Sequence, residues 1–200
     1  GLGITADDEK LGLAVANLAL LTGMVNREGC GIAFLGEKCN SQGTLDMGVL
    51  PGFLPGFSEI GDAKARGVFD EAWKISLSPR PGLQAMDMIK AAAEGRLRAL
   101  YLAGENPLLT YPESDYTQKA LESLDFLVVQ DLFLTPTARL ADVVLPVASF
   151  AEKRGTYTSF ERRVQVLSPA LPMLEGARTD LEIFCELSRR MGYVMQASGP

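Results

Sequence analysis

Three short apolar runs, each followed by polar residues or proline, constrain the fold of this chain more than any other feature. They lie at residues 97–103, 124–129 and 143–145. The runs are apolar throughout rather than alternating, which is typical of parallel strands covered on both faces. Helical patterns precede them, at residues 83–94, 114–123 and 136–140. This alternation predicts an α/β fold with a doubly wound, mostly parallel sheet.

Three further helices are expected outside this alternating region. Residues 8–22 have apolar side chains at helical spacing and end at Gly23, a residue that commonly stops a helix. A short helix is expected at 67–75, and a last one begins at Thr179, where Thr-Asp-Leu-Glu fits a capping box. Leu11, Val15, Leu18 and Leu21 form one stripe on the first helix, and Leu181, Phe184, Leu187 and Met191 form the apolar face of the last.

Two long segments between these elements are expected to be irregular. Residues 24–62 are rich in glycine and show little periodicity, and residues 150–178 are rich in charge. Long segments of this kind in a compact domain are usually functional or disordered, and the apolar content of the first argues against disorder. We therefore expect two parts: residues 1–62, with a strand end, a helix and a long loop, and residues 63–200, as one α/β unit.

The composition excludes several classes of function. The net charge is −6, from 25 acidic and 19 basic residues, so no basic excess drives binding to a nucleic-acid backbone. Histidine is absent, which removes Ser-His-Asp triads, Cys-His pairs and histidine metal sites, and we assign no catalytic or metal-binding residue. Scattered cysteines favour a reducing compartment, the cytoplasm. The longest apolar run, at 11–21, is too short to span a bilayer.

Polar residues follow the first two expected strands directly. Residues 104–107, Gly-Glu-Asn-Pro, follow the first strand, and Gln130 with Asp131 follow the second. Ligands bind outside the carboxyl ends of the strands in an open parallel sheet, so adjacent strands would place these side chains on one rim. A surface turn fixed by Pro107 explains the same residues, and spacing alone favours the turn.

The residue types at this rim suit one class of ligand. A carboxylate can accept hydrogen bonds from guanine N1–H and from its exocyclic amine together. Glycine allows the backbone to approach a phosphate closely. Thr135 and Thr137 follow within one helical turn and could donate hydroxyl hydrogen bonds to a pyrophosphate.

A second polar cluster lies inside the long first loop. Asn40, Gln42 and Gly43 form either a ligand-facing loop or a packed loop with satisfied amides, and composition does not choose between them. Cys39 has no visible base, so a buried structural thiol is favoured over a nucleophile. Residues 161–163, Glu-Arg-Arg, are by default a solvated charge run, with an anion clamp as the sharper alternative.

Several stretches together resemble the molybdopterin oxidoreductase family, particularly the large subunits of formate dehydrogenases and the G-type large subunit of NADH-quinone oxidoreductase. The resemblance covers almost the whole chain, in order. Its most specific stretch is DFLVVQDLFLTPTARLADVVLPVASFAEKRGTYTSFERRVQ, and it includes NSQGTLDMGVLPGFLPGF, LYLAGENPL and TDLEIFCELSRRMGY. The chain opens with GLGIT, which resembles the family's Gly-x-Gly-x-Thr strand end, so we expect a piece of a longer parent chain.

The resemblance implies a cofactor and a set of residues around it. Parent chains of this family bind a bis(molybdopterin guanine dinucleotide) cofactor that carries molybdenum or tungsten, and an N-terminal Fe4S4 cluster outside this segment. On this basis residues 1–62 face the cofactor, and residues 63–200 resemble a discontinuous guanine-dinucleotide-binding domain. The residues that match cofactor-binding positions are Gly3, Thr5, Asn40, Gln42, Gly43, Gly104, Glu105, Asn106, Gln130, Asp131 and Thr135.

The chain also departs from the family. Formate dehydrogenases have an arginine that helps to hold formate where this chain has Gly36, and a glutamine where it has Lys38. Ser159 stands where many members have asparagine. Without the arginine, the obvious partner of a formate anion is missing, which favours another substrate or a G-type respiratory subunit.

Three functions are consistent with these features. The first is a cofactor-holding segment of a molybdopterin oxidoreductase, with the rest of the parent chain and electron-transfer subunits as partners and any membrane association made through those subunits. The second is a scaffold domain of a respiratory complex that has lost the metal cofactor. The third is a free-standing domain that binds GMP or GDP. In the first two cases the isolated 200-residue chain is expected to be inactive.

Overall fold

The computed structural model describes residues 6–32 and 38–195, with side chains described from Lys10 onward, and it divides into two compact units. One unit comprises the chain up to Leu77 together with Thr156–Gln165, and the other comprises Ser78–Gly155 and the chain from Val166 onward. The boundary expected at residue 62 stays a prediction about the domains of the parent chain. The α/β fold class is confirmed, because the second unit is built on a parallel sheet.

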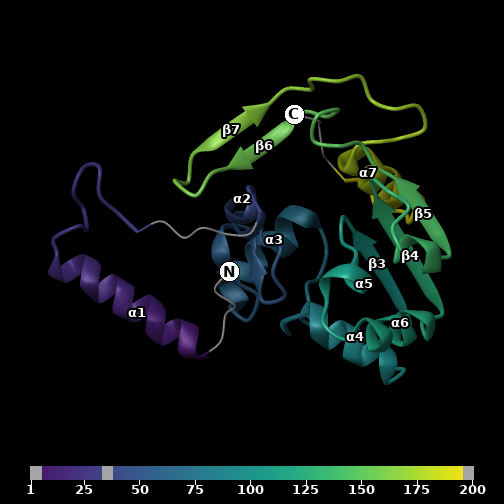
Figure 1. Cartoon of the computed structure of the whole chain (residues 1–200), viewed down its shortest axis with the longest axis horizontal. Helices are drawn as coiled ribbons and strands as arrows, with labels where there is room; N and C mark the ends of the chain where they lie inside the picture. The colour runs from purple at the N-terminus through teal and green to yellow at the C-terminus, as the bar shows by residue number, and fades with distance from the viewer. Residues whose placement is uncertain (1–5, 33–37, 196–200) are drawn as a thin grey trace. The chain divides into compact units, whose positions relative to one another are not determined.

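The sheet of the second unit has three parallel strands in the order β3-β4-β5 (Figure 1). They are β3 (Ala99–Ala103), β4 (Phe126–Asp131) and β5 (Val143–Pro146). The register pairs Ala103 with Gln130 and Asp131 with Pro146, so the carboxyl ends of the strands lie at one edge. Parallel pairing of the three apolar runs agrees with the expectation from the sequence.

Helices cover both faces of this sheet. The elements are α4 (Ala85–Ala93), α5 (Pro107–Thr110), α6 (Ser114–Glu122), η2 (Ala138–Leu140) and α7 (Asp180–Arg190). On one face, Leu127 and Val129 of β4 share a buried cluster with Ile89 of α4 and Leu121 of α6. On the other face, the Tyr101 ring of β3 lies 5.9 Å from the ring of Phe184 on α7. Two covered faces explain why the strands are apolar throughout.

Three expectations from the sequence are corrected in this unit. Strand β4 extends two residues past its apolar run, so Gln130 and Asp131 belong to the strand rather than to the loop after it. The short helix α5 was not predicted, because its four residues are too few to show a period. The capping box at Thr179 is confirmed, but the buried residue of α7 is Ile183 rather than a member of the predicted face, and Met191 is 85% exposed.

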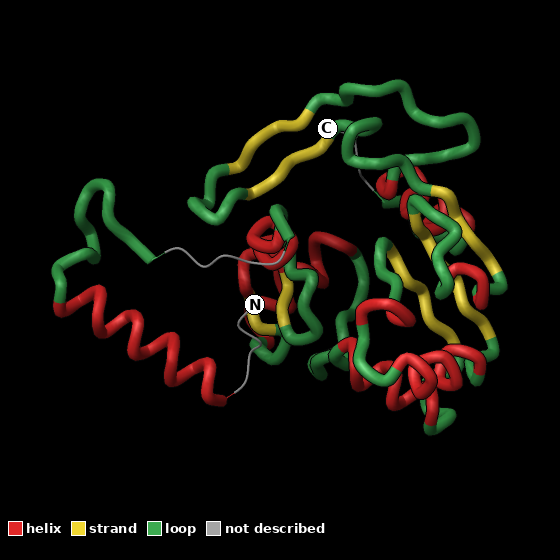
Figure 2. The backbone as a smooth tube through the Cα atoms, viewed as in Figure 1, coloured by secondary structure: helices red, strands yellow, loops and turns green. Residues whose placement is uncertain are grey.

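Residues 150–178 were expected to be irregular, and this expectation is wrong for part of the segment. Strands β6 (Gly155–Thr158) and β7 (Val164–Leu167) pair as a hairpin (Figure 2). Its turn is closed by the Ser159 N–H donating to the Arg163 carbonyl at 3.0 Å. Arg162 sits in the left-handed region at φ 60°, which a residue in a tight turn can adopt.

The first unit consists of short elements joined by loops. They are α1 (Ala6–Leu21), α2 (Ser41–Asp46), β1 (Phe53–Leu54), η1 (Pro55–Phe57), β2 (Ser58–Glu59) and α3 (Ala63–Trp73), with most of the β6–β7 hairpin. Helix α3 begins four residues before the predicted start. The reason is Asp62, whose side chain accepts a hydrogen bond from the Lys64 N–H at 2.8 Å and caps the helix.

Helix α1 has apolar residues all round its circumference, and the predicted apolar stripe is exposed in the described structure. Leu11 is 46% exposed, Leu18 is 61% exposed and Leu21 is 86% exposed, whereas Ala19 is buried. The helix ends where predicted, with Gly23 at φ 67°. No helix within the described ranges reaches the length and apolarity that a membrane crossing requires. A water-exposed helix of this composition needs a covering surface.

The core of the second unit gives a stability prediction. Replacing Leu127, which is 2% exposed, with alanine leaves a cavity between β4 and the helices and should lower the free energy of unfolding by about 2–5 kcal/mol. The matched control is Leu109→Ala, since Leu109 is 77% exposed; it should change stability by less than about 0.5 kcal/mol. Urea denaturation of both variants, followed by circular dichroism, provides the measurement. Equal effects would contradict the assignment of this core.

Candidate functional site

The ends of β3 and β4 meet, as the rim hypothesis requires. The two strands are hydrogen-bonded neighbours, and the Gly104 N–H donates to the Gln130 carbonyl at 2.8 Å. We call Gly104, Glu105, Asn106, Asp131 and Thr135 the rim. Adjacency of the two strands, which the sequence left open, is therefore confirmed.

Asn106 is held in one orientation by the buried residue Thr137. The Thr137 hydroxyl donates to Asn106 Oδ1 at 2.6 Å and accepts from the Leu108 N–H at 3.2 Å. The Thr137 N–H points to the same Oδ1 at 3.4 Å. With the amide oxygen engaged, the Nδ2 donors of Asn106 have no partner among the described residues, and Asn106 is half-buried. The side chain therefore offers two hydrogen-bond donors from a fixed position.

Glu105 orders the loop that leads into α5. Its Oε1 accepts from the Thr110 hydroxyl at 2.6 Å and from the Asn106 N–H at 3.2 Å. Burial raises the pKa of the nearby Tyr111 phenol, and the negative charge of Glu105 raises it further. Tyr111 is accordingly neutral at physiological pH.

Asp131 and Thr135 each keep hydrogen-bonding capacity. Asp131 Oδ1 accepts from the Phe133 N–H at 3.2 Å, while Oδ2 has no partner among the described residues. The Thr135 hydroxyl accepts from the Ala138 N–H at 3.1 Å, which leaves its own proton to donate. Gly104 has φ 66°, and a Cβ at this position would meet nothing within 4 Å, so the backbone is open to close approach. The rim thus combines a carboxylate acceptor, a hydroxyl donor and accessible backbone.

Phe133 is a rim neighbour that the sequence analysis did not select. Its side chain is 73% exposed directly after the Asp131 turn. A flat base can stack on such a ring, although single exposed apolar side chains are also common on protein surfaces. The sequence signal for Phe133 was an aromatic residue between a strand end and a helical turn. Aromatic residues of a hydrophobic core show the same pattern.

Gln130 differs from the other predicted residues because it is completely buried. Its Oε1 accepts from the Tyr101 hydroxyl at 2.5 Å, and its Nε2 donates to Asp180 Oδ1 at 2.6 Å. The other Asp180 oxygen forms an ion pair with Lys153. Burial raises the pKa of Tyr101 and the Asp180 charge raises it further, so the phenol is a neutral donor. Gln130 therefore lies under the rim and not on its surface.

The predicted residues of the first unit lie at the start of helix α2, with Asn40 at its N-cap position and Gln42 and Gly43 inside the helix, so the loop expected at these residues is wrong. Asn40 Oδ1 accepts from the Thr158 N–H of the hairpin at 2.9 Å, and Gln42 Nε2 donates to Asp46 Oδ1 at 2.7 Å. A Cβ on Gly43 would lie 2.4 Å from Asn40 Oδ1, so glycine is required there by the Asn40 side chain. These contacts explain the Asn-x-Gln-Gly pattern by packing, and a further role toward a ligand stays a prediction.

The other residues singled out in the sequence lie away from the rim or outside the described ranges. Gly3, Thr5 and Gly36 lie outside the described residues. Cys39 was expected to be a buried thiol, and this is wrong, because it is exposed on a loop next to the α2 start. Residues 161–163 are exposed on the hairpin turn, which agrees with a solvated charge run. Within the described ranges, no group of three or more acidic or cysteine side chains could hold a metal ion.

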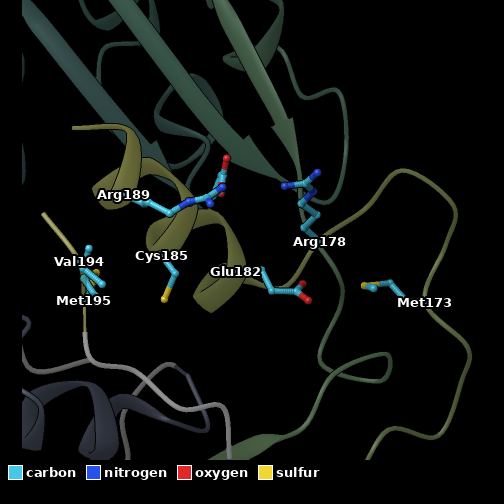
Figure 3. Close-up of a pocket in the computed structure, with 8 residues that line it drawn as sticks. Met173, Arg178, Glu182, Cys185, Arg189, Val194 and Met195 are labelled. Carbon is cyan, nitrogen blue, oxygen red and sulfur yellow. The ribbon is translucent and has the colours of Figure 1, made fainter. Parts of the chain in front are cut away.

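A separate hollow of about 460 Å³ lies beside α7 (Figure 3). Glu182, Cys185 and Arg189 project from the helix into it, and Arg178 lies on the segment before the helix. Its two arginines and two glutamates carry opposite charges, and Arg189 pairs with Glu186 at 2.5 Å. Because these charges balance, the hollow has no evident preference for an anion or a cation, and the rim remains the stronger candidate.

Two glycines give a matched test of the packing around Asn40. Gly43→Ala should lower the free energy of unfolding by about 1–3 kcal/mol, because the new methyl group overlaps Asn40 Oδ1. Gly67 lies inside α3 with nothing within 4 Å, so Gly67→Ala should raise stability by about 0.5–1 kcal/mol. Thermal unfolding of both variants checks the signs. A stabilising effect of Gly43→Ala would contradict the described contact.

Comparison with known proteins gives several matches. The molybdopterin oxidoreductase family matches residues 4–190. Putative formate dehydrogenase YrhE of Bacillus subtilis (strain 168) is 44% identical over 202 residues, which cover 100% of this chain and 21% of the relative. F420-dependent formate dehydrogenase subunit alpha of Methanocaldococcus jannaschii is 45% identical over 180 residues, or 90% and 26% of the two chains. The second G-type subunit of NADH-quinone oxidoreductase in Rhizobium meliloti is 40% identical over 170 residues, or 85% and 20%.

A solved structure of acetylene hydratase from Pelobacter acetylenicus matches over 54% of this chain and 15% of its own, with a TM-score of 0.49 and 27% identity. The chain thus spans 21%, 26% and 20% of the lengths of the three curated relatives above. The family match extends over nearly the whole chain. The resemblance found in the sequence is therefore confirmed, and this chain belongs to the molybdopterin oxidoreductase family, as a segment related to formate dehydrogenase alpha subunits and to the G-type large subunit of NADH-quinone oxidoreductase.

Proposed function

We propose that this segment holds a guanine dinucleotide end of the molybdopterin cofactor within a longer oxidoreductase. The observation that carries the proposal is the meeting of two parallel strand ends with unsatisfied polar atoms, Asn106 Nδ2 and Asp131 Oδ2, on a half-buried edge. Strand ends of this kind are the usual ligand position in open α/β sheets. Family membership supplies the class of ligand.

The chemistry of the rim fits the guanosine diphosphate portion of such a cofactor. The Asp131 carboxylate is an acceptor suited to guanine N1–H and its exocyclic amine. The Asn106 amide and the Thr135 hydroxyl are donors suited to phosphate or ribose oxygens, and open backbone at Gly104 suits close approach of a phosphate. Phe133 adds an exposed ring on which a base can stack.

In this proposal, the cofactor and the protein have different roles in the parent chain. When bound, the cofactor's molybdenum or tungsten supplies the redox chemistry, and the protein supplies binding and orientation. In this proposal the residues of the rim hold the nucleotide end, while the metal ligand and an Fe4S4 cluster lie outside the segment. Electron-transfer subunits and the remainder of the parent chain are the proposed partners.

Helix α1 supports the proposal that the segment works inside a larger protein. Its apolar side chains face all directions, and Leu13 and Leu20 are 59% and 62% exposed. A helix that is apolar all round is normally buried. This chain spans only 21%, 26% and 20% of the curated relatives named above, so they contain further chain of the kind that could cover such a helix. The isolated segment is accordingly proposed to be inactive.

A second candidate is a scaffold domain of a respiratory complex that has lost the metal cofactor. It is favoured by Gly36, which stands where the resemblance to formate dehydrogenases leads us to expect arginine. An arginine fork binds a carboxylate in a way that glycine cannot. The same observation argues that, if the parent is an active oxidoreductase, its substrate differs from formate.

A single carboxylate tests the first candidate. In the full-length parent, Asp131→Ala should lower the content of molybdenum or tungsten and of pterin at least about tenfold, because one charged partner of the buried guanine is lost. Folding stability should change little, since Asp131 makes one backbone hydrogen bond in the described structure. Metal analysis, pterin fluorescence and thermal unfolding are measured on the same preparations.

The control is Asp115→Ala, which removes an exposed carboxylate from the first turn of α6. It should keep the wild-type cofactor content. If both variants retain the cofactor equally, or if Asp131→Ala unfolds as it loses the cofactor, the carboxylate is structural. A wild-type parent without molybdenum, tungsten and pterin would instead support the scaffold candidate.

A further inference from the structure

We propose that Gln130 is a positioning residue for the rim, which acts through Tyr101 and Asp180 and does not touch the ligand. The inference rests on the proposed function of the rim as a nucleotide site. It assigns to Gln130 a different role from the direct contact that the family resemblance implied.

The burial of Gln130 separates its side chain from the rim. Gln130 has no exposed surface, whereas Asp131 beside it is half-buried at the rim. The pleat of β4 explains the difference, because successive side chains of a strand point to opposite faces. Gln130 points to the face covered by α7, where it reaches Asp180, and a ligand outside the strand ends has no path to its amide.

Both the oxygen and the nitrogen of the Gln130 amide have hydrogen-bond partners. Tyr101 on β3 donates to Oε1, and Nε2 donates to Asp180 at the start of α7. Lys153, from the segment before β6, pairs with the second oxygen of Asp180. One network, buried at Gln130 and partly exposed at Asp180 and Lys153, therefore joins two strands, a helix and a loop, and hydrogen bonds to both ends of the buried amide fix its orientation.

The network of Gln130, Tyr101 and Asp180 lies directly under the rim. The Gln130 carbonyl accepts from the Gly104 N–H at 2.8 Å, and the Asp131 carbonyl accepts from the Val147 N–H at 3.3 Å. A shift of Gln130 would therefore move Gly104 on one side and Asp131 on the other. Residues that orient direct ligands in this way typically change affinity by about 10–100-fold when they are removed.

The test uses Gln130→Glu, which replaces the amide donor with a carboxyl group. In the protonated state the acid can donate to Asp180 and accept from Tyr101, so it reproduces the native pattern. In the ionised state it faces the Asp180 carboxylate. We expect burial and the Asp180 carboxylate to favour the protonated form of the introduced carboxyl and so to raise its pKa, against the opposing charge of Lys153, which pairs with Asp180.

The nucleotide affinity of Gln130→Glu should therefore fall as the pH rises. Below the raised pKa the carboxyl is protonated and the network forms; as the pH rises through that pKa the network is lost. Guanosine diphosphate affinity of Gln130→Glu, measured by calorimetry on the full-length parent freed of its cofactor, should be close to wild type near about pH 5 and at least about tenfold weaker at pH 8. Each affinity is compared with that of wild type at the same pH, because the terminal phosphate of guanosine diphosphate itself ionises near about pH 6.

Two companion variants sharpen the result. Gln130→Glu combined with Asp180→Asn exchanges acceptor and donor, removes the like-charge contact, and should recover affinity at pH 8. Gln118→Glu is the matched control, because Gln118 also donates to a carboxylate, Glu122, at 2.7 Å, but on the exposed face of α6. It should bind guanosine diphosphate as wild type does at both pH values.

A second readout separates this inference from the proposed function. Amide hydrogen exchange at Gly104 and Val147 should accelerate in Gln130→Glu at pH 8, after correction for intrinsic rates, while exchange at buried Val129 changes less. If wild type binds no guanosine diphosphate, the proposed function fails, and the exchange data still decide the role of Gln130. Should Gln130→Glu not fold at pH 8, Gln130→Met, uncharged and similar in size, replaces it, with weaker binding expected at both pH values. Wild-type affinity and wild-type protection of both amides in these variants would overturn the inference.

Discussion

The parallel pairing of β3 with β4 is the constraint on which the rest of the second unit depends. Its register sets Ala103 beside Gln130, and so it brings the Gly104 loop and Asp131 to the same edge of the sheet. Burial of Leu127 and Val129 against α4 and α6 stabilises this register on one face. A slip of one residue would turn both side chains to the opposite face of the sheet. The packing that stabilises the sheet therefore also sets the position of the rim.

Much of this arrangement was predictable because it depends on local pattern. Non-alternating apolar runs indicated parallel strands, and the capping box located the start of α7. The burial of Gln130 was not predictable, because the run of apolar residues ends before the strand does. Its decisive partner, Asp180, lies 50 residues further along the chain, and no local pattern links an amide on β4 to a carboxylate on a distant helix.

The first unit shows a different limit of sequence interpretation. The two strands of the β6–β7 hairpin have only four residues each, too few to show a period, and the link of the hairpin to Asn40 spans 118 residues. Gly43 could be recognised as unusual, but not as the neighbour of an asparagine side chain. Helix α1 was correctly recognised as a helix, yet its predicted apolar stripe is exposed, and a helix that is apolar all round has no preferred face to bury.

The central claim is that the adjoining ends of β3 and β4 hold a guanine nucleotide. Titration of the isotopically labelled chain with guanosine diphosphate, followed by amide NMR, tests this claim most directly. The account predicts chemical-shift changes concentrated at residues 104–106 and 131–135, with the amides of the hollow beside α7 and of the hairpin turn at 161–163 unaffected. Changes confined to the hollow or to the hairpin turn, or no change in a folded chain at millimolar nucleotide, would contradict it.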